Sequence, residues 1–168
     1  LTYEPKGPEE FLADVKIGGA TKRWQSAYEL SKQLSDPNAE TVSDRFLAEM
    51  ASTYEYALND PNPRVRQYLL RAMGQTGHSS FVGTISTALN ETDENVVADA
   101  VYALSFYDNL GNSRLIDEMA SHASPLVRNR TAIALGMMKS AKNENSLPSL
   151  LSDPEPNVRW NAAVSLAK

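Results

Sequence analysis

Residues 65–74 read VRQYLLRAMG, and a segment of the same kind returns after every 31 residues. The copies read VVADAVYALS at 96–105, VRNRTAIALG at 127–136 and VRWNAAVSLA at 158–167. Apolar residues at the first, fifth or sixth, eighth and ninth positions of each copy have the spacing of an amphipathic helix. A fixed period of this length is typical of a solenoid, in which each repeat buries its apolar face against its neighbours.

A second helix is expected before each copy, because other apolar rows keep the same step. One of these rows holds Leu58, Leu89, Ala120 and Leu151. The turn between the two helices reads NDPNPRV at 59–65, where Asp and Asn cap a helix and Pro fits its first turn. Each repeat is therefore predicted to be a helical hairpin.

An irregular copy comes first, at residues 22–34, and the step from Lys22 to Val65 is longer than the others by about twelve residues. We expect one domain, residues 9–168, and a tether rich in proline and charge over residues 1–8. The five predicted hairpins cover residues 9–34, 41–77, 79–108, 112–140 and 144–168.

The turn sequences resemble the HEAT repeat, specifically the short bacterial type also found in phycobilisome lyases. The segments at 60–66 (DPNPRVR) and 153–159 (DPEPNVR) match the pattern closely, whereas the third copy lacks both its proline and its arginine. The resemblance implies an all-α, right-handed α-α superhelix of about five hairpins. It also implies a ladder of hydrogen bonds between neighbouring repeats, which by position would involve Arg23, Asp60, Arg66, Arg128, Asp153 and Arg159.

A partner-binding face is expected on the second helices, which line the concave side in proteins of this type. Tyrosine, tryptophan and arginine recur there at positions away from the apolar rows, and these residue types dominate binding hot spots. The candidate binding residues are Tyr28, Tyr68, Arg71, Tyr102 and Arg130. Trp24 and Trp160 share one repeat position, and we expect both to pack between helices.

Several other classes of function have little support in the sequence. The net charge is −5, from 16 basic and 21 acidic residues, which disfavours nucleic-acid binding despite the clustered arginines at 64, 66, 71, 128 and 130. His78 and His122 stand 44 residues apart without partner ligands, so no metal is expected. With no cysteine and no nucleophile motif, neither catalysis nor chromophore-lyase activity is expected.

These features favour a non-catalytic scaffold that needs no cofactor and binds another protein or an extended peptide. An accessory or regulatory subunit of a larger enzyme or membrane-transport assembly is the alternative. We expect a monomer without a membrane-inserted segment, because no apolar run of about eighteen residues is present. The chain begins at Leu1, so the compartment stays open between the cytoplasm and a periplasmic position behind a removed anchor.

Overall fold

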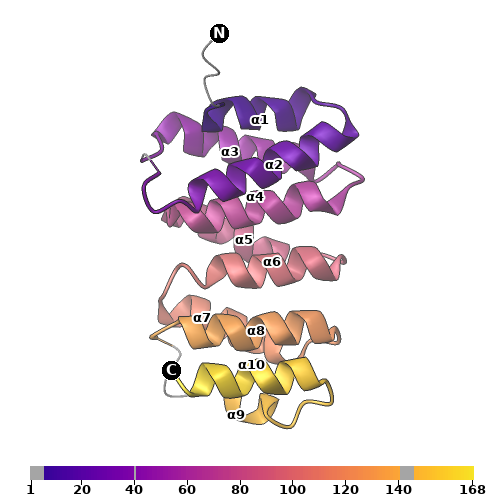
Figure 1. The fold of residues 1–168 in the computed structure, drawn as a ribbon, viewed down its shortest axis with the longest axis vertical. Coiled ribbons are helices and arrows are strands. Elements are labelled where there is room, and N and C mark those ends of the chain that lie inside the picture. The colour runs from indigo at the N-terminus through magenta and orange to yellow at the C-terminus, as the bar shows by residue number, and fades with distance from the viewer. Residues whose placement is uncertain (1–5, 40, 141–145) are drawn as a thin grey trace.

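The computed structural model describes residues 6–39, 41–140 and 146–168, and all regular structure in these residues is helical (Figure 1). Five hairpins are stacked as a right-handed α-α superhelix. Their first helices are α1 (Pro8–Ile17), α3 (Asp44–Ala57), α5 (Val82–Ala88), α7 (Leu110–Glu118) and α9 (Leu147–Leu150). Their second helices are α2 (Ala20–Leu34), α4 (Pro63–Thr76), α6 (Glu94–Leu104), α8 (Pro125–Met137) and α10 (Pro156–Leu166).

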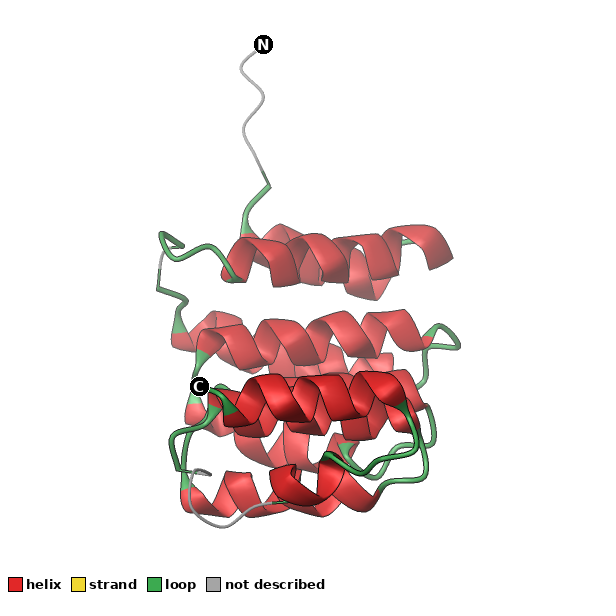
Figure 2. Ribbon diagram, turned by 60° about the horizontal axis from the view of Figure 1, so that its bottom comes forward, coloured by secondary structure: helices red, strands yellow, loops and turns green. Residues whose placement is uncertain are grey.

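Local sequence sets where the helices begin and end. The side chains of Ser43, Asn62 and Asp93 accept hydrogen bonds from backbone amides in the first turns of α3, α4 and α6. Proline begins α4, α8 and α10, where its missing N–H costs nothing. Gly77 ends α4 with φ at 62°, a left-handed conformation that glycine adopts without strain. Short loops join the helices at both ends of the stack (Figure 2).

The two layers of helices are packed differently. The second helices pack directly against one another from α2 through α10. Among the first helices of the described residues, only α1 and α3 pack against each other to a similar extent. A stack that is tight in one layer and spread in the other curves toward the tight layer, so the second helices line the concave side.

Small residues allow this tight packing. A Cβ atom on Gly74 of α4 would lie 2.9 Å from the Cα of Ala103 on α6. A Cβ atom on Gly136 of α8 would lie 3.0 Å from the Cα of Ser165 on α10 and closer still to its side chain. The core between the layers is continuous, and the recurring valines Val65, Val96, Val127 and Val158 are fully buried in it.

Some details differ from the sequence expectation. The first helix begins at Pro8, which the sequence analysis assigned to the tether; the rest of the predicted tether, up to Pro5, lies outside the described residues. In the described residues, α9 is a single turn of four residues, and residues 141–145 of the predicted fifth repeat lie outside the description. Short 3₁₀ segments, Ser79–Phe81 and Met119–Ser121, replace parts of the expected first helices.

Candidate functional site: a concave aromatic face beside an arginine ladder

The turns of the stack are joined by arginines at the start of the second helices. Arg128 donates from Nε and Nη2 to the two carboxylate oxygens of Asp153 in the next repeat, at 2.7 and 3.0 Å. Its Nη1 donates to the carbonyls of His122 and Ala123 in its own turn, both at 2.9 Å. The Arg128 guanidinium lowers the pKa of Asp153, because a hydrogen-bonded cation stabilises the carboxylate.

Two further arginines connect repeats in the same way. Arg23 donates from Nε to Asp60 at 2.5 Å and from Nη1 to the carbonyl of Gly18 at 3.0 Å. Arg66 donates to Glu91 at 3.2 Å and to the carbonyl of Asp60 at 3.0 Å. The sequence analysis did not identify Glu91, although it lies one 31-residue step after Asp60 and takes the place of the turn aspartate.

The ladder has two irregular positions. Arg159 was expected to join neighbouring repeats, but its Nη1 donates only to the carbonyls of Asp153 and Pro154 in its own turn. Between the third and fourth repeats, the buried Val97 stands where the other repeats have arginine. His122 stands where they have Asp60 or Asp153, and its Nδ1 accepts from the amide of Ser124 at 3.1 Å.

The concave layer brings all five candidate binding residues into one connected group. We name this group the aromatic–arginine face; it comprises Trp24 and Tyr28 of α2, Arg64, Tyr68 and Arg71 of α4, Asp99 and Tyr102 of α6, Phe106 just after α6, and Arg130 of α8. Most of these residues stand three or six positions after the recurring valine, so the helical period turns them toward the same side. Four neighbouring helices therefore contribute to one surface.

The N-terminal half of the face is built around two tyrosines. The rings of Tyr28 and Tyr68 meet edge to face with centroids 5.2 Å apart. The Arg71 guanidinium lies 5.4 Å from the centre of the Tyr68 ring. Arg64 lies in the same way over Trp24, at 5.3 Å. Tyr28 is 40% exposed, whereas Tyr68 and Arg71 are half-buried, so the rings are available to a partner mainly along their edges.

The other half of the face repeats this arrangement. Arg130 lies 5.2 Å from the centre of the Tyr102 ring, and Tyr102 meets Phe106 edge to face at 5.1 Å. Arrangements of this kind contribute beyond simple burial, since guanidinium and ring attract each other through the ring's quadrupole. The sequence analysis placed Tyr102 and Arg130 on this face but did not assign Phe106 to it.

A buried carboxylate joins the two halves. Asp99 is 2% exposed and accepts from both Nε and Nη2 of Arg71 at 2.9 Å. Burial raises the pKa of Asp99, and the charges of Arg71 and Arg130 partly offset this. The sequence offered no signal for this burial, because an aspartate at a surface position of a helix is ordinarily solvated.

The C-terminal end of the concave layer is more polar. Asn161 of α10 donates to the side-chain oxygen of Asn129 on α8 at 2.7 Å. The expectation that both tryptophans pack between helices is wrong for Trp160, which is 70% exposed on α10. Trp24 is half-buried and packs against the core.

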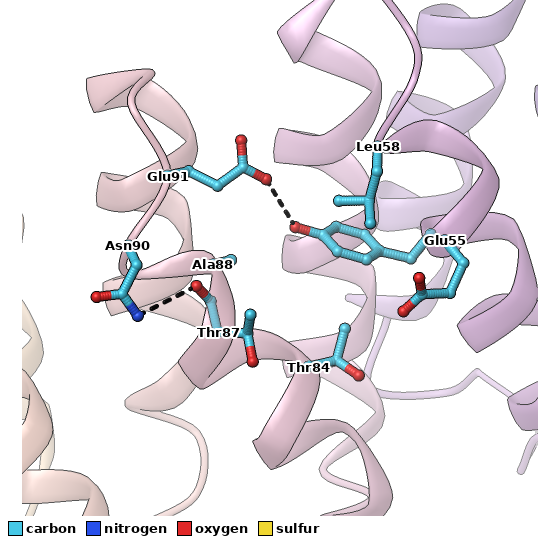
Figure 3. Close-up of a pocket in the computed structure, with 8 residues that line it drawn as sticks. Glu55, Leu58, Thr84, Thr87, Ala88, Asn90 and Glu91 are labelled. Atoms are coloured by element: carbon cyan, nitrogen blue, oxygen red, sulfur yellow. Dashed lines mark hydrogen bonds between the residues drawn. The ribbon is translucent and has the colours of Figure 1, made fainter.

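The outer layer contains a pocket of about 490 Å³ between α3 and α5 (Figure 3). It is lined by Tyr54, Glu55, Leu58, Thr84, Thr87, Ala88, Asn90 and Glu91. The Tyr54 hydroxyl donates to Glu91 at 3.5 Å, and burial raises the pKa of this tyrosine. Since α3 and α5 are spread apart on the convex side, we interpret the pocket as a result of the curvature.

The described residues give no indication of a metal centre or a membrane span. No group of three or more His, Cys, Asp or Glu side chains within them is arranged to hold a metal ion. No helix of the described ranges has both the length and the apolar composition needed to cross a bilayer.

Comparisons with known proteins agree with this architecture. The chain resembles the crystal structure of an engineered protein, with a TM-score of 0.60 and 15% identity, over 97% of this chain and 79% of the other. It also resembles the crystal structure of the MAST/Orbit N-terminal domain, with a TM-score of 0.55 and 18% identity, over 97% and 83% of the two chains. At these identities the likeness concerns the fold alone.

No curated protein matches the sequence. The family model for HEAT repeats matches residues 51–117 and 112–168, which together make up well over half of the chain. With the stacked hairpins described above, this match shows that the chain belongs to the HEAT-repeat family.

Proposed function

We propose that this protein is a non-catalytic scaffold whose concave face binds another protein, in particular an extended segment of it. HEAT repeats are commonly protein-interaction scaffolds, and their folds are typically non-enzymatic. The observation that supports the proposal here is the aromatic–arginine face. It gathers tyrosine, tryptophan and arginine side chains on four consecutive helices of the side that curves around a ligand.

The face has the physical properties of a preorganised binding surface. Each guanidinium is held over a ring, and Arg71 is also fixed by Asp99, so few rotamers have to be frozen when a partner binds. The rings offer apolar area next to hydrogen-bond donors, the combination that characterises hot spots. We propose further that the protein acts as a monomer, binds neither nucleic acid nor a cofactor, and does not insert into a membrane.

The finer family assignment is also a proposal. The turn sequences at 60–66 and 153–159 support the short bacterial type of repeat found in phycobilisome lyases. Lyase activity itself is not part of the proposal, because the chain has no cysteine to act as nucleophile.

The test is affinity capture from cells of the native organism, with the partners identified by mass spectrometry. The face variant carries Tyr28→Ala, Tyr102→Ala and Arg130→Ala; Arg71 is kept, because its removal would leave Asp99 buried without its ion pair. The matched control carries Tyr56→Ala, Arg45→Ala and Arg114→Ala, which change exposed residues of the first helices α3 and α7.

A partner that the wild type and the control retain and the face variant loses supports the proposal. Retention by the face variant, with the partner lost from the control, would place binding on the convex side and contradict it. If the captured partner is a single stoichiometric enzyme or transport assembly, the protein is an accessory subunit that still uses this face.

A further inference from the structure

The aromatic–arginine face is positively charged on a chain that is acidic overall. Within the face, Arg64, Arg71 and Arg130 carry three positive charges, and Asp99 carries the one negative charge. The chain as a whole has a formal charge of −5. Concentrating cations on one side of an acidic protein favours the encounter with a negatively charged partner.

The three arginines have hydrogen-bonding capacity left for a ligand. Arg71 uses Nε and Nη2 for Asp99, and its Nη1 makes no hydrogen bond in the described part of the chain. The side chains of Arg64 and Arg130 make no hydrogen bond within the described residues, since each is held only over a ring. A guanidinium stacked in this way keeps its planar fork of donors, which matches a carboxylate in two-point contact.

The same geometry disfavours nucleic acid as the ligand. Surfaces for single strands offer exposed ring faces on which bases stack. Here the faces of Trp24, Tyr68 and Tyr102 are covered by arginines, and Tyr28 meets Tyr68 through an edge. Asp99 in the middle of the face would also repel a phosphate backbone.

The spacing of the charges restricts the peptide. Arg71 lies on α4 and Arg130 on α8, two helices apart, with Asp99 on α6 between them. Packed helices are about 8–10 Å apart, so two steps are about 16–20 Å. An extended peptide rises about 3.3 Å per residue, so this distance corresponds to about six residues. A carboxylate in the middle of the peptide would face Asp99 and be repelled.

Resting on the proposed function, we infer that the aromatic–arginine face binds an extended peptide with two acidic side chains about six residues apart and an uncharged segment between them. Arg71, with Arg64 on the same helix, binds one carboxylate, and Arg130 binds the other. The uncharged segment crosses α6, where it packs beside Tyr102 and Phe106.

The test uses fluorescence anisotropy with labelled nonapeptides and the full chain. The probe is Ser-Glu-Thr-Val-Thr-Val-Thr-Glu-Ser. One control has Gln in place of both Glu residues, a second has Lys in their place, and a third has the same two Glu residues at positions four and six. A fifteen-nucleotide oligothymidine is the nucleic-acid control.

The expected result is that the wide-spaced Glu peptide binds at least about tenfold more tightly than the Gln and close-spaced peptides, as loss of one charged hydrogen bond implies. Arg130→Gln should lower that affinity about tenfold for the same reason. Arg45→Gln on the outer helix α3 should leave it unchanged. Asp99→Asn should bring the close-spaced peptide nearer to the wide-spaced one, because the repulsion at α6 is removed.

Other outcomes would overturn the inference. Equal binding of the Glu and Gln peptides would refute the acidic class while supporting a peptide-binding face. Absence of binding by the wide-spaced Glu peptide, or tighter binding of the Lys peptide, would refute the inference alone, since partner capture tests the proposed function independently. Tighter binding of oligothymidine would refute both the inference and the proposal that the protein binds no nucleic acid.

Discussion

Two sets of arginines on the same helices have different tasks. In the ladder, Arg128 uses Nε, Nη1 and Nη2 to hold a carboxylate and two carbonyls, and its side chain is 13% exposed. On the concave face, Arg130, only two residues later, is held over the Tyr102 ring and makes no hydrogen bond in the described residues. Arginines that use up their donors inside the protein join repeats, whereas those that keep donors available are suited to a ligand.

The largest expected effect separates these two residues directly. Arg128→Ala should lower the free energy of unfolding by about 3 kcal/mol, because Asp153, 5% exposed, loses its ion pair and two carbonyls lose a donor. Arg130→Ala should lower it by less than about 0.5 kcal/mol. Urea unfolding of both variants measures the difference, and equal losses would remove the distinction between the two sets.

The second prediction concerns binding. Tyr102→Ala should cost about 2 kcal/mol in affinity for the native partner, since it removes the ring on which both Arg130 and Phe106 rest. Titration calorimetry measures the loss, and Tyr56→Ala on the outer layer is the matched control. An unchanged affinity in Tyr102→Ala would exclude this half of the face from the interface.

A third prediction extends the ladder to the junction where it is missing. Val97→Arg combined with His122→Asp should raise the free energy of unfolding by about 1 kcal/mol over Val97→Arg alone, through a new charged hydrogen bond. Val97→Arg alone should be destabilising, because it introduces an unpaired guanidinium at a buried position. Additive effects in this double-mutant cycle would show that the two positions do not pair.

The smallest effect is expected in acid. The Arg128 guanidinium lowers the pKa of Asp153 in the folded state, so this pair contributes stability above the unfolded value of about 3.9. That contribution is lost as the pH falls through the lower folded value. Unfolding measured between about pH 5 and 2 should therefore show a shallower decline in Asp153→Asn than in the wild type. A parallel decline would mean that other carboxylates, such as Asp14 beside Lys22 and Lys6, dominate.

Periodicity made the fold predictable. The valine step of 31 residues set the register of α4, α6, α8 and α10, and the prolines and aspartates of the turns located their starts. The lengths of the first helices were less predictable, since α5 and α9 have few sequence signals and end where tertiary packing sets them. A helix with only one or two turns is determined by its neighbours more than by its own residues.

The site was predictable as a set of positions but not as a set of contacts. Helical spacing placed Tyr28, Tyr68 and Tyr102 on one side. Which guanidinium lies over which ring depends on rotamers chosen between neighbouring helices, and a single sequence does not specify these. The pairing of Arg66 with Glu91 was missed because the family pattern has aspartate at that position, although the longer glutamate side chain reaches the same donor.

The missing ladder position gives the stack an uneven response to cold. On the turn side, the third and fourth repeats meet through the buried Val97, without the arginine–carboxylate pair found at the other junctions of the described residues. Apolar contacts weaken on cooling, whereas ion pairs do not depend on the hydrophobic effect. At low temperature this junction is therefore the first to loosen, and the solenoid divides there into a block of three repeats and a block of two.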